Sequence, residues 1–145
     1  MALKILLVDD HKMVLKAVRT MLEGYRDWEV CGEALDGREA VDKAIKLHPD
    51  LIVMDFAMPR MNGLNAAREI SALTPDVPII LNTLYSYAPL NVEAERCGIW
   101  ATVEKTQLGS LPLAIDKVLN MQAKSHADTL PGDTSNFGVE LNLKH

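Results

Sequence analysis

The segment LIVMDFAMPRMNG, residues 51–63, joins a short apolar run to an aspartate and then to a loop. Four successive apolar residues followed by Asp55 are typical of a strand buried on both faces, as in a parallel sheet. A buried carboxylate is costly unless it is paired, bound to a metal or used in chemistry. We therefore expect Asp55 to meet other polar groups at the end of its strand.

The composition favours one compact domain with an apolar core. The chain has 145 residues, of which 48% are hydrophobic, and a formal net charge of −5. This acidic balance argues against binding to nucleic acid or to an anionic membrane, because phosphate binding usually needs a basic patch. Cys31 and Cys97 lack metal-ligand spacing, and we expect reduced thiols in a cytoplasmic protein. The start, MALKILLVDD, meets two acids instead of a cleavage site, so no signal peptide is expected.

Apolar runs typical of strands alternate with patterns typical of helices along residues 3–121. Strands are expected at 3–9, 28–34, 51–55, 78–82 and 99–105. Helices are expected at 13–22, 36–47, 64–73, 90–97 and 111–119. Asp36 is expected to cap the second of these helices.

The alternation of five strands with five helices predicts a parallel sheet covered on both faces. The strands at 3–9, 51–55 and 78–82 are almost wholly apolar and should be central, whereas 28–34 and 99–105 carry charge and should be edges. With right-handed crossovers, this predicts a doubly wound α/β sheet of order 2-1-3-4-5, the flavodoxin-like (βα)5 arrangement.

The composition changes after the last expected helix, which divides the chain into a domain at 1–122 and a polar, turn-rich linker or tail at 123–145. Within the tail, FGVELNL (137–143) alternates apolar and polar residues. This segment could add a strand to the sheet edge of this molecule or a neighbour, or it could be a frayed tail.

Polar side chains arrive where the predicted strands end. Carboxyl ends of parallel strands share one edge of the sheet, so these side chains should lie together. Carboxylates this close raise one another's pKa, and they stay ionised most readily if Mg²⁺ and an ammonium group share the site. The side chains concerned are Asp9, Asp10, Asp55, Asn82, Thr83 and Lys105.

This set of residues resembles the response-regulator receiver family of two-component signalling. The resemblance extends over about residues 3–121. It is carried by LLVDDH (6–11), MDFAMPRMNG (54–63), Thr83 after PIILN, and Lys105 in GIWATVEK. Each piece alone is weakly specific, but the order and the intervals together are highly specific.

The resemblance implies that Asp55 is the phosphoacceptor of a phosphorelay and that Thr83 and Lys105 contact the phosphoryl group. The phosphoryl group would come from a histidine kinase, a phosphotransfer protein or a small phosphodonor, so no enzyme activity beyond self-phosphorylation and self-dephosphorylation is expected. The implied Mg²⁺ ligands are Asp9, Asp10, Asp55 and the backbone carbonyl of Ala57. His11 is expected to be a surface residue of the first helical turn and not a metal ligand.

The sequence departs from the family pattern beside the phosphoacceptor. Ala57 offers no side chain to orient a water, and Leu84 stands where the family usually has a small residue. Leu84 and Tyr85 would flank the site and restrict access to it. These departures lead to the hypothesis that an aspartyl phosphate on this chain is long-lived.

A further departure concerns the switch residues, Thr83 and Thr102. The family usually has an aromatic residue at position 102, which moves when the threonine moves. Trp100 and Tyr85 are possible substitutes, but neither stands at the matching position. The usual coupling is therefore expected to be absent or to follow other contacts.

Several alternatives remain open from the sequence. The chain could be a degenerate receiver that binds proteins without phosphorylation. A phosphatase with an aspartate nucleophile is disfavoured because the second acid that it needs is replaced by Ala57. The downstream partner could be an effector protein or a missing C-terminal output domain, and neither direct nucleic-acid binding nor membrane association is expected. A homodimer through the helices at 90–97 and 111–119 is possible.

Overall fold

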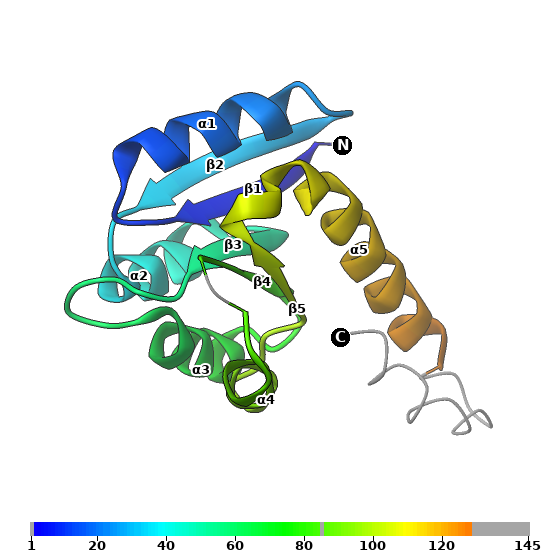
Figure 1. Cartoon of the computed structure of the whole chain (residues 1–145). Coiled ribbons are helices and arrows are strands. Elements are labelled where there is room, and N and C mark those ends of the chain that lie inside the picture. Colours follow the sequence, from blue (N-terminus) through cyan, green and yellow to red (C-terminus); the bar gives the residue numbers. More distant parts are fainter. Residues whose placement is uncertain (1, 85, 129–145) are drawn as a thin grey trace.

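A computed structural model of the chain describes residues 2–84 and 86–128, in which strands and helices alternate (Figure 1). The strands are β1 (Leu3–Val8), β2 (Trp28–Ala34), β3 (Leu51–Asp55), β4 (Ile79–Thr83) and β5 (Ala101–Glu104). The helices are α1 (Lys12–Glu23), α2 (Gly37–Leu47), α3 (Gly63–Leu73), α4 (Ala88–Arg96) and α5 (Leu111–Asp128), with a 3-10 segment η1 (Lys105–Ser110) before α5. The possible strand at 137–143 lies outside the described residues.

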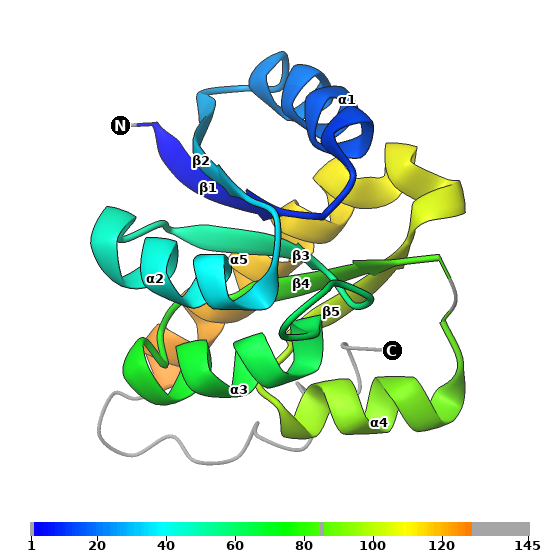
Figure 2. The ribbon, with the colours of Figure 1, turned by 90° about the vertical axis from the view of Figure 1, so that its left-hand side faces the viewer.

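The five strands form one parallel sheet of order β2-β1-β3-β4-β5, which confirms the predicted topology. Helices α1 and α5 pack on one face, and α2, α3 and α4 pack on the other (Figure 2). The prediction for the last strand was too long, since β5 is confined to Ala101–Glu104. Lys105 belongs to η1, where the chain turns across the end of the sheet.

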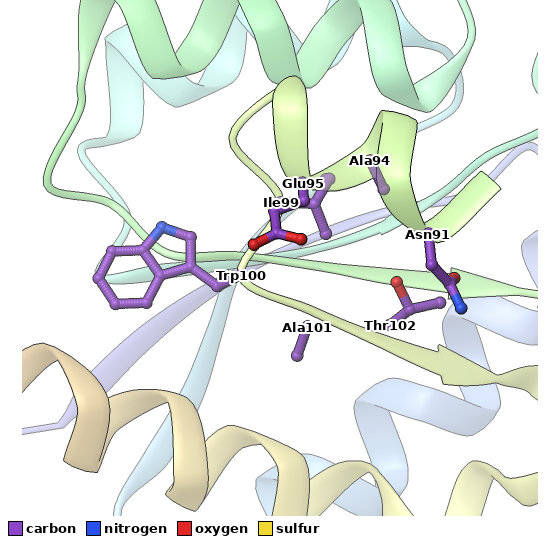
Figure 3. Close-up of a pocket in the computed structure, with 7 residues that line it drawn as sticks. All are labelled: Asn91, Ala94, Glu95, Ile99, Trp100, Ala101 and Thr102. Carbon is purple, nitrogen blue, oxygen red and sulfur yellow. The ribbon is translucent and has the colours of Figure 1, made fainter. Parts of the chain in front are cut away.

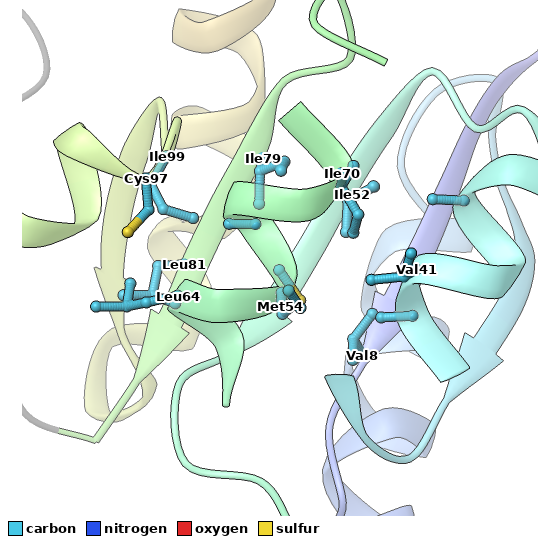
Figure 4. Close-up of a cluster of buried hydrophobic side chains, with 14 of the residues drawn as sticks. Val8, Val41, Ile52, Met54, Leu64, Ile70, Ile79, Leu81, Cys97 and Ile99 are labelled. Atoms are coloured by element: carbon cyan, nitrogen blue, oxygen red, sulfur yellow. The ribbon is translucent and has the colours of Figure 1, made fainter. Parts of the chain in front are cut away.

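The packing of β3 in the apolar core decides which face of the sheet Asp55 lies on. All five residues of β3 are buried. Ile52 and Met54 belong to the cluster under α2, α3 and α4 (Figure 4), whereas Leu51 and Val53 belong to the cluster under α1 and α5. Because side chains alternate along a strand, Asp55 faces the α1 and α5 side.

Two helix starts fix the loops around β3. Asp36 caps α2 as predicted, and its carboxylate accepts a 2.8 Å hydrogen bond from the Glu39 backbone N–H. Asn62 caps α3 in the same way. Gly63 lies so close to β3 that a Cβ atom on it would be 2.1 Å from the Asp55 carbonyl oxygen. The glycine is therefore needed for this close approach, which holds α3 against the end of β3.

Within residues 2–84 and 86–128, no helix has the length and apolar character that crossing a membrane requires. Helix α5 continues past residue 122 to Asp128.

Candidate functional site

Two buried carboxylates share one lysine at the carboxyl end of the sheet. Asp9 follows β1, Asp55 ends β3 and Lys105 begins η1. The Lys105 ammonium nitrogen lies 2.6 Å from Asp9 Oδ2 and 3.3 Å from Asp55 Oδ2. The three side chains are at most 11% exposed, so solvent screens these charges weakly. The topology thus brings together three residues that are far apart in the chain.

The burial of this group changes its ionisation. Burial, followed by the neighbouring charge of Asp9, raises the pKa of Asp55 above the usual value for an aspartate, although Lys105 opposes the shift. Burial alone would lower the pKa of Lys105. The hydrogen bond to Asp9 and the charges of Asp55 and Asp9 outweigh that effect and raise it. Lys105 therefore stays a cation while it holds the two carboxylates in place.

Asp9, Asp10 and His11 form the opposite side of the site. The His11 backbone N–H donates to Asp9 Oδ1 at 2.9 Å, and His11 Nδ1 lies 3.1 Å from that same oxygen. His11 Nδ1 is also 3.0 Å from Asp10 Oδ1. Neither aspartate caps α1, because His11 itself occupies the N-cap position. Both carboxylates are therefore available at the end of the sheet, within 4.8 Å of a carboxylate oxygen of Asp55.

These residues fit a hard divalent cation. Ligand atoms of Asp9, Asp10, His11 and Asp55 all lie within 4.8 Å of one another. Asp10 Oδ1 is buried and lies 3.0 Å from the His11 ring nitrogen, and a carboxylate oxygen has a second lone pair with which it could bind a cation. Carboxylate oxygens are the ligands that Mg²⁺ prefers. His11 was not expected in this group. Its position directly after Asp10 is the sequence signal that could have indicated it.

The remaining predicted residues lie around this group in different ways. Thr83 is buried at the end of β4, where the sheet edge faces the site. Ala57 is exposed in the loop after β3, and the Leu84 side chain is 56% exposed. Much of the Leu84 side chain is therefore in solvent. Tyr85 lies outside the described residues.

Thr102 lies away from the charged group, on the side of β5 that faces α4. Its side chain is half-buried and borders a small pocket together with Asn91 and Glu95 of α4 (Figure 3). Trp100 also borders this pocket, but its ring points away from Thr102 (Figure 3) and packs with the cluster under α1 and α5. The Trp100 ring therefore does not occupy the space beside Thr102.

Comparison with known proteins identifies the family. The response regulator receiver domain matches residues 5–116, which include both the acidic residues and the lysine. The chain belongs to the response regulator receiver family. The resemblance to this family that LLVDDH, MDFAMPRMNG, Thr83 and Lys105 carry is confirmed.

Individual relatives differ in length. The chain is 41% identical over 101 residues to the chemotaxis protein CheY of Thermotoga maritima, covering 68% of this chain and 81% of CheY. It is 40% identical over 126 residues to a protein-glutamate methylesterase/protein-glutamine glutaminase of Methanosarcina mazei, covering 87% of this chain and 31% of that protein. It is 33% identical over 131 residues to VraR of Staphylococcus saprophyticus, covering 90% and 63%. The chain thus spans less than two thirds of the methylesterase and of VraR.

Solved structures agree with the fold. The response regulator domain of Thermotoga maritima CheB superposes with a TM-score of 0.77 at 30% identity, covering 85% of this chain and 98% of that domain. A LuxR-family response regulator from Aurantimonas superposes with a TM-score of 0.79 at 29% identity, covering 83% and 86%.

Proposed function

We propose that this receiver accepts a phosphoryl group on Asp55 with the help of Mg²⁺. The observation that supports this proposal best is the Lys105 ammonium held between two buried carboxylates. Sharing the ammonium between Asp9 and Asp55 leaves Asp55 beside a fixed positive charge, where an incoming phosphoryl group would gather its negative oxygens.

The chemistry follows from these positions. An Asp55 carboxylate oxygen attacks phosphorus, the bond to the donor's leaving group breaks, and an aspartyl phosphate forms. Lys105 lies 3.3 Å from Asp55 Oδ2 before phosphorylation. After it, the ammonium pairs with one phosphoryl oxygen and the Thr83 hydroxyl donates to another. Bound Mg²⁺ would supply charge neutralisation for the transferring oxygens. We assign its protein ligands to Asp9, Asp10, Asp55 and the Ala57 carbonyl.

The proposed partners lie on either side of this step. A histidine kinase or a phosphotransfer protein donates the phosphoryl group. The signal is received by an effector protein or by an output domain. The relatives that are longer than this chain have enough residues for such a domain. We propose that phosphorylation shifts the face made by α4, β5 and α5 through contacts other than the usual coupling between positions 83 and 102, and that this face pairs with a partner or a second copy. Cys31 and Cys97 are free, which agrees with a cytoplasmic location.

A phosphorylation assay tests the proposal. The wild-type protein is incubated with Mg²⁺ and acetyl phosphate, and the intact mass is compared with that of Asp55→Asn. One added phosphoryl group on the wild type, absent from Asp55→Asn, is the expected result. A beryllofluoride mimic should bind with the same dependence on Asp55.

The same assay separates the alternatives. Repeated phosphate release from unrelated monoesters would indicate a hydrolase and contradict the proposal. No mass change and no bound mimic would indicate a degenerate receiver. The small side chain of Thr102, where the family usually has an aromatic residue, is the observation that favours this second candidate.

A further inference from the structure

Asn82 is a buried amide that the proposed chemistry does not use. It lies in β4 directly beside Asp55 of β3 and Val103 of β5. Only 3% of the residue is exposed, and its Oδ1 accepts no hydrogen bond from residues 2–84 or 86–128. An amide oxygen without a donor destabilises a fold when it is buried, so an apolar side chain would suit this strand better. We therefore expect a hydrogen-bond donor to lie beside the Asn82 amide oxygen.

A small cavity lies next to this amide. It has a volume of about 10 Å³ and separates the sheet from α1. This is close to the smallest space that holds one water molecule. Its polar lining comes from Asn82 and Asp9, and the other lining residues are apolar, among them Leu7, Val14, Val18 and Val53. A single molecule in this cavity would therefore have Asn82 and Asp9 as its two polar neighbours.

We propose that Asn82 holds one buried water that bridges its Oδ1 to the Asp9 carboxylate and so positions Asp9 for the cation. The water donates one O–H to the Asn82 amide oxygen and the other to a carboxylate oxygen of Asp9. Asn82 is thus a positioning residue, because it acts on the cation only through Asp9. The inference rests on the proposed function, since the cation concerned is the Mg²⁺ assigned to this site.

The contacts of Asp9 explain why a third restraint matters. Oδ1 accepts from the His11 backbone N–H, and Oδ2 pairs with Lys105. Lys105 also pairs with Asp55, so its hold on Asp9 changes when Asp55 takes a phosphoryl group. The bridge from Asn82 comes from the sheet interior and keeps Asp9 in place through that change. Hydrogen-bond partners behind a metal ligand commonly alter metal affinity by about 10- to 100-fold.

Calorimetric titration with Mg²⁺ alone tests the inference, using the wild type, Asn82→Leu, Asn82→Ser and Val18→Ile. Asn82→Leu removes the acceptor and fills the cavity. Its Mg²⁺ affinity should fall about tenfold, while its thermal midpoint should stay close to that of the wild type, because an apolar side chain of similar size replaces the amide and its water together. Asn82→Ser keeps an acceptor and should stay within about threefold of the wild type. Val18→Ile fills the cavity from α1, retains Asn82, and should weaken binding in the same direction as Asn82→Leu.

Each result points to a different conclusion. Equal Mg²⁺ affinity of the wild type and Asn82→Leu overturns the inference alone, whereas a wild type that binds no Mg²⁺ overturns the proposed function and this inference with it. Weaker binding by Asn82→Leu with unchanged binding by Val18→Ile overturns the water bridge. A high-resolution crystal structure of the wild-type protein should show the water between Asn82 and Asp9, and continuous apolar packing there would also overturn the inference.

Discussion

The strand-end site and the outer side of β5 are built in opposite ways. At the strand ends, Lys105 is buried and paired with Asp9 at 2.6 Å and with Asp55 at 3.3 Å. Along β5, Thr102 is half-buried between the small pocket toward α4 and a groove of about 280 Å³ toward α5. The strand-end site thus holds close, oppositely charged neighbours, whereas the β5 side is lined by side chains of mixed size, from Ala101 to Met121, with open space beside them. Substitutions should therefore have large effects in the first region and small effects in the second.

The largest effect after loss of Asp55 itself is expected from Lys105→Met. This change removes the ammonium beside Asp55, and phosphorylation by acetyl phosphate should slow by about 100-fold. Lys117→Met, on the exposed side of α5 and bordering the groove, is the matched control and should react at the wild-type rate. Circular dichroism of both variants should match that of the wild type, which would show that they are folded. Equal phosphorylation rates for Lys105→Met and the wild type would contradict the expectation that substitutions at the strand-end site have the larger effects.

Gly63→Ala should destabilise the fold by about 2–3 kcal/mol, because the new methyl group collides with the Asp55 carbonyl. The displaced end of β3 should also slow phosphorylation. Urea unfolding measures the first effect. Gly109→Ala is the control, since a Cβ atom there meets nothing within 4 Å, and it should change stability by less than about 0.5 kcal/mol. Similar losses in both variants would contradict the close-approach explanation.

Asp55→Asn should make the protein more stable at neutral pH. The fold raises the pKa of Asp55, so the stability that Asp55 contributes is present below its unfolded pKa and lost as pH rises through the folded one. We expect the variant to exceed the wild type by about 1 kcal/mol at pH 7, and the difference to shrink toward pH 4. Urea unfolding at several pH values measures this. Asp42→Asn, on the exposed side of α2, should show no such trend.

Thr102→Ala should have the smallest effect. The side chain is half-buried in a region with open space, so stability should change by less than about 0.5 kcal/mol. The extent of phosphorylation should equal that of the wild type. The conformational response can be followed by comparing amide hydrogen exchange in α4 and β5 with and without beryllofluoride. If Thr102→Ala loses that response, Thr102 is part of the switch and the β5 side is less tolerant than its packing indicates.

The sequence by itself determined the fold and which charged residues would meet at the strand ends. Runs such as LIVMD are typical of strands buried on both faces, and their alternation with amphipathic helices favoured the sheet order 2-1-3-4-5. Since parallel strands end together, Asp9, Asp55 and Lys105 were expected at one edge, and the structure places them there. The ends of elements were less certain, because Lys105 continues the pattern of β5 but belongs to η1.

Only the tertiary structure decided how these groups are shared. It showed that one ammonium serves two carboxylates, that His11 turns toward Asp9 and Asp10, and that the Trp100 ring points away from Thr102. It also placed the Asn82 amide beside a small cavity and the Asp9 carboxylate. Sequence periodicity states which face of an element is buried. Partners, distances and cavities depend on how elements from distant parts of the chain pack together, and no local pattern contains that information.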